Sequence, residues 1–409
     1  VAIVGQLIFV YNLAIWGSTS GAGLFGAQYF GSGDMEGVRH TFRFKLLVAA
    51  AITAGGILLF SLAGKNLISA YIAADTVPAD AAATLGYAWQ YLCIMLVGLV
   101  PFALTQCYAG TLRESGQTVL PMKASMIAMV VNFIFNALLI FGLFGFPCMG
   151  VAGAAVATVL SRFVELAIVA VGAHSSVERY PFFAGVYENM HIPAALAKNI
   201  LLRSAPLLLN ELMWGMGQAI LLQCYSVRGI QVVAALNICN TISQIFNEVF
   251  LSLGNATAIV VGQELGADHL TGARRTAWRM LSLSVMSCVV MGLLLSLCAP
   301  LIPQIYNTEE SIRLLSTELI RAVALCMPLF GFANCAYFTL RSGGKTFITF
   351  LFDSCFTCGI TVPVAYVLAH YTAMPIVLIF LVANGLDLIK CVIGFVLLKK
   401  GIWVKNIVK

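Results

Sequence analysis

The chain has 409 residues, of which 60% are hydrophobic and only 10% are charged, and its formal net charge is +6. A soluble protein of this length cannot bury so much apolar surface, so the composition excludes a soluble globular fold and indicates a membrane protein. The positive charge suits contact with acidic lipid headgroups, and we expect no nucleic-acid partner.

Apolar stretches long enough to cross a bilayer follow one another along the whole chain. A helix needs about 20 such residues to span the hydrocarbon layer. We predict eleven spanning helices, at roughly Ile3–Ala27, Phe42–Leu62, Ala88–Ala109, Leu120–Phe141, Val151–Val171, Ile200–Cys224, Ile230–Leu253, Ala277–Ala299, Leu319–Thr339, Phe347–Leu368 and Pro375–Leu398. The predicted fold class is therefore an all-α polytopic membrane protein.

A repeated pattern relates the two halves of the chain. Gln28, Gly31, Gly37 and Arg39 recur in the second half, all at one constant offset, as Gln263, Gly266, Gly272 and Arg274. Thr111-Leu112-Arg113 recurs at a slightly smaller offset as Thr339-Leu340-Arg341. The smaller offset predicts an insertion of about seven residues in the first copy, in the loop around Lys65–Thr84. Two long copies of one plan in an apolar chain indicate a transporter with two related lobes.

The repeat also predicts how the lobes are divided. Ile200–Cys224 opens the second copy, and its partner would lie before Val1, so we expect one helix to precede this chain. The intact protein would then have twelve helices in two parallel six-helix repeats. We predict an N-lobe at residues 1–171 with five of its six helices, a cytoplasmic linker at 172–198, and a C-lobe at 199–409 with six helices and a cytoplasmic tail.

Basic residues predict the orientation in the membrane. In this topology 19 of the 23 Lys and Arg residues, including Arg39, Arg113 and Arg274, fall on one side. The positive-inside rule makes that side cytoplasmic, and the C-terminus lies there as well. We therefore expect a multi-pass protein of the cytoplasmic (inner) membrane.

Two pairs of opposite charges lie within the predicted spans. Arg162 and Glu165 are three positions apart, and so are Asp387 and Lys390. Residues at this spacing are neighbours on a helix surface, so we predict local pairing or an interfacial position for both pairs.

Three further carboxylates in the predicted spans have no basic residue three or four positions away: Glu211, Glu248 and Asp353. Such a group must be protonated, bind a cation, or meet a partner from another helix. All three lie in the second half, which is therefore the predicted location of a coupling-ion site.

Six motifs are spread over both halves: Gly21–Asp34, Asn132–Gly142, Gly150–Thr158, Pro206–Trp214, Val261–Ala267 and Trp403–Asn406. Together they resemble the multidrug and toxic compound extrusion (MATE) transporters, and the likeness runs from that family's second helix to the end of the chain. The resemblance implies two six-helix bundles, alternating access, and export of mostly cationic amphiphiles in exchange for Na⁺ or H⁺.

The same resemblance bears on the site residues. Glu211 stands in the helix where the family commonly has a coupling carboxylate, and it would bind Na⁺ if Na⁺ is the coupling ion. Asn132 and Asn136 match a pair whose second member is Asp in the proton-coupled branch, and Asn136 cannot titrate. We expect Glu211 to be the principal coupling acid, with Asp353 and Glu248 as secondary candidates and the two asparagines as binding residues.

The predicted function is secondary antiport by a monomer with no cofactor, acting on small cationic molecules. Na⁺ and H⁺ both stay open as the coupling ion. One alternative is a lipid-linked oligosaccharide flippase of the same superfamily, which would favour a basic cavity, whereas the isolated charges in the predicted spans are acidic. Another is a membrane-embedded transferase, but the five histidines lie in separate loops rather than in one constellation.

Overall fold

The computed structural model describes residues 1–71 and 78–409, and within these ranges every regular element is a helix. The all-α prediction is confirmed. Residues 72–77, in the loop where we predict an insertion, lie outside the described residues. The helices are longer than the predicted spans because their backbone hydrogen bonds continue through polar residues beyond the apolar stretch.

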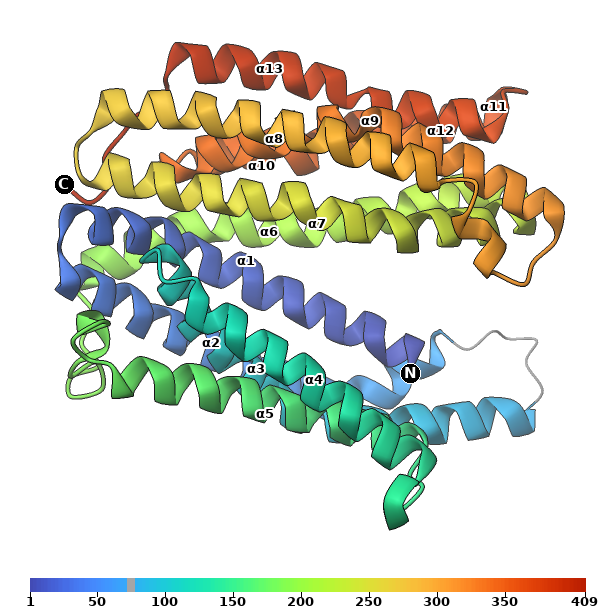
Figure 1. The fold of residues 1–409 in the computed structure, drawn as a ribbon, viewed down its shortest axis with the longest axis horizontal. Helices are drawn as coiled ribbons and strands as arrows, with labels where there is room; N and C mark the ends of the chain where they lie inside the picture. The colour runs from blue at the N-terminus through green and yellow to red at the C-terminus, as the bar shows by residue number, and fades with distance from the viewer. Residues whose placement is uncertain (72–77) are drawn as a thin grey trace. The chain divides into compact units, whose positions relative to one another are not determined.

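The helices follow the predicted order (Figure 1). The first half contains α1 (Ala2–Ser32), α2 (Met35–Ser69), α3 (Pro78–Glu114), α4 (Val119–Phe141) and α5 (Val151–Ser175). The second half contains α6 (Ala194–Ser226), α7 (Ile230–Gly266), α8 (Leu270–Cys298), α9 (Glu310–Ser342), α10 (Thr346–Phe350), α11 (Val362–Tyr371), α12 (Ile376–Gly385) and α13 (Asp387–Lys400). Two π-helical turns join α10 to α11, so these elements form the tenth predicted span, and α12 with α13 forms the eleventh.

In the described part of the chain, ten helical segments are long and apolar enough to cross a membrane. They correspond to ten of the eleven predicted spans. The remaining one, α6, has Arg203, Asn210 and Glu211 along its length, and these polar residues lower its hydropathy. A membrane crossing by α6 therefore stays a prediction.

The described helices divide into two compact units. Residues 1–30 and 34–208 form unit 1, and residues 31–33 and 209–409 form unit 2. Since α6 runs without a break through residues 208 and 209, the predicted division into an N-lobe, a linker and a C-lobe stays a prediction.

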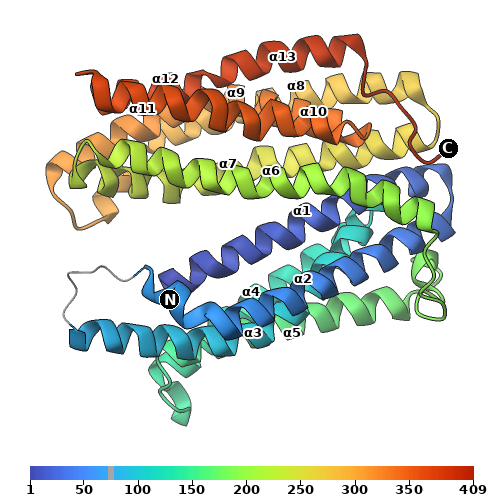
Figure 2. The ribbon, with the colours of Figure 1, turned by 180° about the vertical axis from the view of Figure 1, so that it is seen from behind.

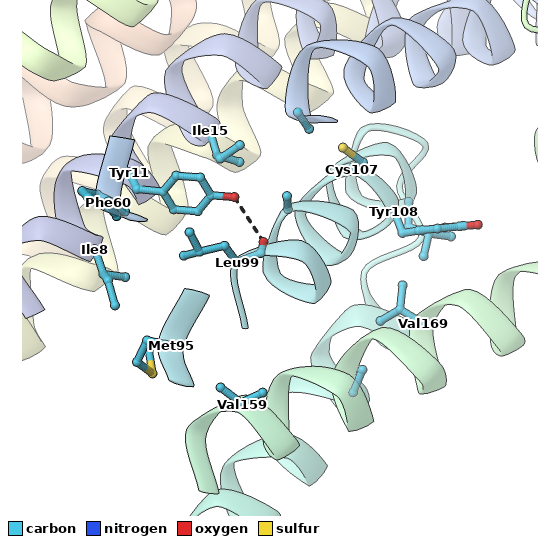
Figure 3. Packing of buried hydrophobic residues seen from close by; sticks show 14 of the residues in the cluster. Ile8, Tyr11, Ile15, Phe60, Met95, Leu99, Cys107, Tyr108, Val159 and Val169 are labelled. Atoms are coloured by element: carbon cyan, nitrogen blue, oxygen red, sulfur yellow. Dashed lines mark hydrogen bonds between the residues drawn. The ribbon is translucent and has the colours of Figure 1, made fainter. Parts of the chain in front are cut away.

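The core of unit 1 lies between α1, α2, α3 and α5. Buried side chains from all four helices pack there, among them Ile15, Phe60, Leu99 and Val159 (Figure 3). The hydroxyl of Tyr11 donates to the carbonyl oxygen of Leu99 at 3.1 Å and lies 2.8 Å from the hydroxyl of Thr53. A buried phenol needs such partners, so these bonds connect α1 to α2 and α3.

The segment between α5 and α6 packs against unit 1. Phe182, Phe183 and Val186 are buried in its core. The guanidinium of Arg43 on α2 donates to the carbonyl oxygen of Val186 at 2.8 Å. Much of the predicted linker is therefore an ordered part of unit 1.

Unit 2 is built around α9, which packs against α7, α8, α12 and α13 (Figures 1 and 2). After α13 the chain folds back over the ends of these helices. The side-chain amide of Asn406 donates to the carbonyl oxygen of Gly266 at 3.2 Å. Gly343 approaches the backbone of Trp403 so closely that a Cβ at this position would overlap it, which explains why glycine stands there.

Candidate functional site

The tenth span is interrupted by two π-helical turns, Leu351–Cys355 and Thr357–Thr361. π-Helical turns are rare in α-helices and frequently occur at functional sites. Pro363 explains part of the interruption because it has no N–H group to donate to the carbonyl of Gly359 one turn earlier. The turns contain the predicted site residue Asp353 together with Ser354 and Thr357.

Lys390 on α13 lies between two carboxylates in unit 2. Its ammonium nitrogen is 3.3 Å from Oδ1 of Asp353 and 3.3 Å from Oδ1 of Asp387. It also donates to the hydroxyl of Thr357 at 3.3 Å. Only 8% of the Lys390 side chain is exposed, and a buried ammonium is tolerated only with such partners. The predicted local pair Asp387–Lys390 is confirmed, and Asp353 meets its partner from another helix.

Asn210 on α6 holds the other side of Asp353. Its amide nitrogen donates to Oδ2 of Asp353 at 3.2 Å. Its amide oxygen accepts from the backbone N–H of Ser354 at 3.3 Å and from the Ser354 hydroxyl at 2.8 Å. The Ser354 hydroxyl is also 2.7 Å from the backbone carbonyl oxygen of Asn210. These bonds connect α6 to the first π-helical turn and leave both carboxylate oxygens of Asp353 with a donor.

Glu211 follows Asn210 on α6 and has a partly exposed side chain. Among the described residues it forms no ion pair, but the charges of Arg341 and Asp353 act on it. Arg341 on α9 is 5% exposed and lies over the ring of Phe338 at 5.2 Å. The structure therefore brings Glu211 and Asp353 into one electrostatic centre with Lys390, Asp387 and Arg341, which we call the unit 2 charge centre.

Glu248 is not joined to this centre by any contact found in the described part of the chain. It lies on α7, and its side chain is exposed. The two predicted asparagines lie in unit 1. Asn136 donates to the amide oxygen of Asn132 at 3.0 Å, and Asn132 lies 3.4 Å from the hydroxyl of Thr158 on α5.

Arg162 and Glu165 on α5 form no ion pair among the described residues, so the local pairing predicted for them is wrong, and the alternative of an interfacial position stays a prediction. Arg162 donates to the carbonyl oxygen of Gly98 on α3 at 3.2 Å, and its guanidinium lies 4.8 Å from the centre of the Phe102 ring. Glu165 instead accepts a hydrogen bond from Ser125 on α4 at 2.6 Å. Each residue meets a partner on a different helix, and Gly98, which has no side chain, leaves room for Val159 of α5.

Three residues of the charge centre, Asp387, Arg341 and Lys390, were not among the predicted site residues, and neither was Asn210, which holds Asp353. The repeat in the sequence could have pointed to Lys390. The offset that matches Thr111 to Thr339 places Lys390 opposite Arg162, another basic residue within a predicted span. The same offset places Asp353 opposite Ser125. The corresponding helices of the two units are thus joined by different pairs. Ser125–Glu165 joins them in unit 1, and Asp353–Lys390 joins them in unit 2.

Comparison with known proteins identifies the family. The family model MatE matches residues 1–138 and 206–367. The chain belongs to the MatE family. It is 24% identical over 366 residues to "Probable multidrug resistance protein YoeA" of Bacillus subtilis, covering 88% of this chain and 76% of that protein. It is 25% identical over 382 residues to "Probable multidrug resistance protein NorM" of Thermotoga maritima, covering 91% and 78%.

Solved structures of the MatE family share this fold. A crystal structure of MATE in the bent conformation superposes with a TM-score of 0.86 at 18% identity, covering 98% of this chain and 87% of that one. An outward-facing multidrug resistance MATE family transporter of the MOP superfamily superposes with a TM-score of 0.83 at 19% identity, covering 98% and 88%. The predicted family and fold class are confirmed, and the chain is a multi-pass membrane transporter.

Proposed function

We propose that this MatE-family protein is a secondary active antiporter that exports cationic or amphiphilic small molecules in exchange for Na⁺ or H⁺. The observation behind the proposal is the unit 2 charge centre, where three carboxylates share two basic groups in helices that we expect to span the membrane. Charges at such a depth are costly and typically bind an ion or a substrate. The names of the relatives, multidrug resistance proteins, support the substrate class.

Glu211 is the principal coupling acid in this proposal. A coupling group must change its affinity for the ion between inward-facing and outward-facing states. Asp353 already receives two donors, whereas Glu211 has no ion-pair partner among the described residues. It can therefore gain or lose an ion or a proton without first breaking an ion pair. Asp353 is the secondary candidate, and Glu248, Asn132 and Asn136 stay candidate binding residues.

The proposed setting is the cytoplasmic (inner) membrane, with the C-terminus on the cytoplasmic side and the protein acting as a monomer. The excess of Lys and Arg on one side of the predicted topology supports this orientation. Neither the proposed exchange nor the chemistry of the charge centre needs a cofactor.

A lipid-linked oligosaccharide flippase remains a second candidate because of Arg162. From the sequence we expected that only acidic residues would lack an oppositely charged partner within the predicted spans. Arg162 is basic, yet it forms no ion pair among the described residues. A basic group at this depth would suit a phosphate-bearing substrate. Transport assays with cationic dyes and with a lipid-linked oligosaccharide, run side by side, separate the two functions.

The coupling proposal is tested with purified protein in liposomes, with Na⁺ and pH gradients imposed separately. Glu211→Gln preserves size and hydrogen bonding but removes the charge, so we expect gradient-driven export of a cationic substrate to be abolished while the protein stays folded. The matched control is Glu165→Gln in unit 1, which weakens the bond to Ser125 and lowers stability without ending uphill export. Uphill export by Glu211→Gln at the wild-type rate under both gradients would show that the assignment is wrong.

A further inference from the structure

The ammonium of Lys390 occupies a position that would suit a monovalent cation. It contacts one oxygen from each of two carboxylates, Asp353 and Asp387, and the hydroxyl oxygen of Thr357. The ring of Phe356 faces the same nitrogen at 5.3 Å. Carboxylates, a neutral oxygen and an aromatic face are the groups that proteins use to bind alkali and organic ammonium ions.

Lys390 also decides the charge state of its two partners. Two neighbouring carboxylates within a membrane cannot both stay ionised without a nearby cation. All three contacts of the ammonium are 3.3 Å, longer than the roughly 2.8 Å of a tight charge-assisted hydrogen bond. The ammonium is therefore shared between its partners rather than held tightly by one of them.

A second cation at Asp353 would meet the positive charge of the Lys390 ammonium, so the two compete for this carboxylate. Its Oδ1 is taken by Lys390, and its Oδ2 accepts from Asn210 at 3.2 Å. Asn210 is fixed by two donors of Ser354, its backbone N–H and its hydroxyl, which shares one proton between the two oxygens of Asn210. Lys390, by contrast, has a flexible four-carbon stem. Of the two donors, Lys390 is the one that can move away.

We propose that Lys390 is a positioning and specificity-determining residue that competes with the coupling cation for Asp353 and Asp387. Asp353 is the secondary coupling acid of the proposed function, and it receives the ion as the ammonium leaves; the ammonium returns when the ion is released. This inference rests on the proposed antiport function. The competition sets the affinity, because a site that is free for only part of the time binds its ligand more weakly by that fraction.

Two substitutions separate charge from packing. Lys390→Met preserves the length of the side chain and removes its charge, whereas Lys390→Arg preserves the charge. The matched control is Lys45→Met in unit 1, which removes another buried lysine with an acidic partner, Glu114, at 2.5 Å. The measurements are equilibrium binding of radioactive Na⁺ to the full chain in detergent, and the pH midpoint of uphill export in liposomes.

The second measurement covers the case in which the coupling ion is H⁺. The other titratable or charged groups that act on this centre are Glu211, Cys326, Tyr337, Arg341, Cys358 and Cys391. They are unchanged in all three variants, so a shift between wild type and Lys390→Met reports the loss of the ammonium.

If Na⁺ is the coupling ion, we expect Lys390→Met to bind Na⁺ about tenfold more tightly than wild type. If H⁺ is the coupling ion, we expect the pH midpoint of uphill export to move upward by about one unit. Export should fall about tenfold in either case, because nothing displaces the bound ion. Lys390→Arg retains the charge, so its Na⁺ binding and pH midpoint should lie closer to wild type than those of Lys390→Met. Lys45→Met should change neither Na⁺ binding nor the pH midpoint.

A folded Lys390→Met variant with unchanged or weaker Na⁺ binding and an unchanged pH midpoint would overturn the proposal. If Lys390→Met does not fold, Lys390→Gln serves instead, since its amide can still donate to the carboxylates without a charge. Failure of the antiport proposal has a different result, namely no uphill export by the wild-type protein under either gradient. The Na⁺-binding comparison judges Lys390 without relying on export.

Discussion

Arg162 in unit 1 and Lys390 in unit 2 occupy matching positions of the repeat, at the offset that also relates Thr111 to Thr339. Arg162 donates to a backbone carbonyl oxygen and faces an aromatic ring. Lys390 lies between two carboxylates. The same position is thus occupied by a cation in both units, but among the described residues only Lys390 forms ion pairs with acids. The difference fits the coupling site that we propose in unit 2.

A second matched position supports this comparison. Ser125 in unit 1 corresponds to Asp353 in unit 2. Ser125 is a neutral donor to Glu165 at 2.6 Å, whereas Asp353 is an acceptor for Lys390 and Asn210. A hydrogen bond from a hydroxyl joins two helices without requiring a mobile ion. A carboxylate paired with a flexible lysine can exchange that lysine for an ion, so the two contacts join equivalent helices but allow different chemistry.

The largest expected effect tests this pair of positions directly. Asp353→Asn removes the charge that holds Lys390 and Asn210 and should reduce gradient-driven export on the order of a hundredfold, since a buried ion-pair partner is worth several kcal/mol. Ser125→Ala should leave export within about twofold and lower stability by about 1 kcal/mol, the usual value of one hydrogen bond. Uphill export under Na⁺ and pH gradients, with thermal unfolding, checks both. Equal loss of export in the two variants would contradict the comparison.

Much of the fold could be predicted from the sequence because the bilayer restricts the chain to helices of a minimum length. Glu211 and Asp353 could be predicted because they lack a basic residue one turn away. The partners of Asp353 could not, since Lys390 is 37 residues away and Asn210 is 143 away. These contacts depend on the π-helical turns and on how the helices pack. Neither can be predicted from the spacing of residues along one helix.

The spacing rule for local pairs was right once and wrong once. Asp387 and Lys390 do pair across one turn. Arg162 and Glu165 have the same spacing, but Gly98 and Ser125 offer them partners on neighbouring helices. Local spacing makes a pair available, and tertiary packing decides whether it forms.

The next largest effect concerns a buried ion pair of unit 1 that has no proposed part in coupling. Lys45 on α2 pairs with Glu114 on α3 at 2.5 Å, and 1% of the Lys45 side chain is exposed. Lys45→Met should lower the free energy of unfolding by about 3 kcal/mol, because it leaves a carboxylate without its main counter-charge. Denaturant or thermal unfolding in detergent measures this loss.

The double variant Lys45→Met/Glu114→Gln provides the control for this pair. It should recover part of the lost stability, since no isolated charge is left, and a double-mutant cycle gives the coupling between the two residues. Ion-dependent export should persist in every folded member of the cycle. Loss of gradient dependence in these variants would mean that unit 1 also contains coupling residues.

The smallest expected effect is at Arg162. Arg162→Gln removes the interaction with the Phe102 ring and the charge, but a glutamine amide can still donate to the carbonyl oxygen of Gly98. We expect a loss of about 1 kcal/mol in unfolding free energy, the usual size of a cation–π contact together with one weakened hydrogen bond. The dependence of export on Na⁺ and pH should match that of wild type, unlike Lys390→Met at the matching position. A different result would favour the flippase. If Arg162→Gln abolishes movement of a lipid-linked oligosaccharide and leaves the unfolding free energy of the protein unchanged, the guanidinium binds an anionic substrate.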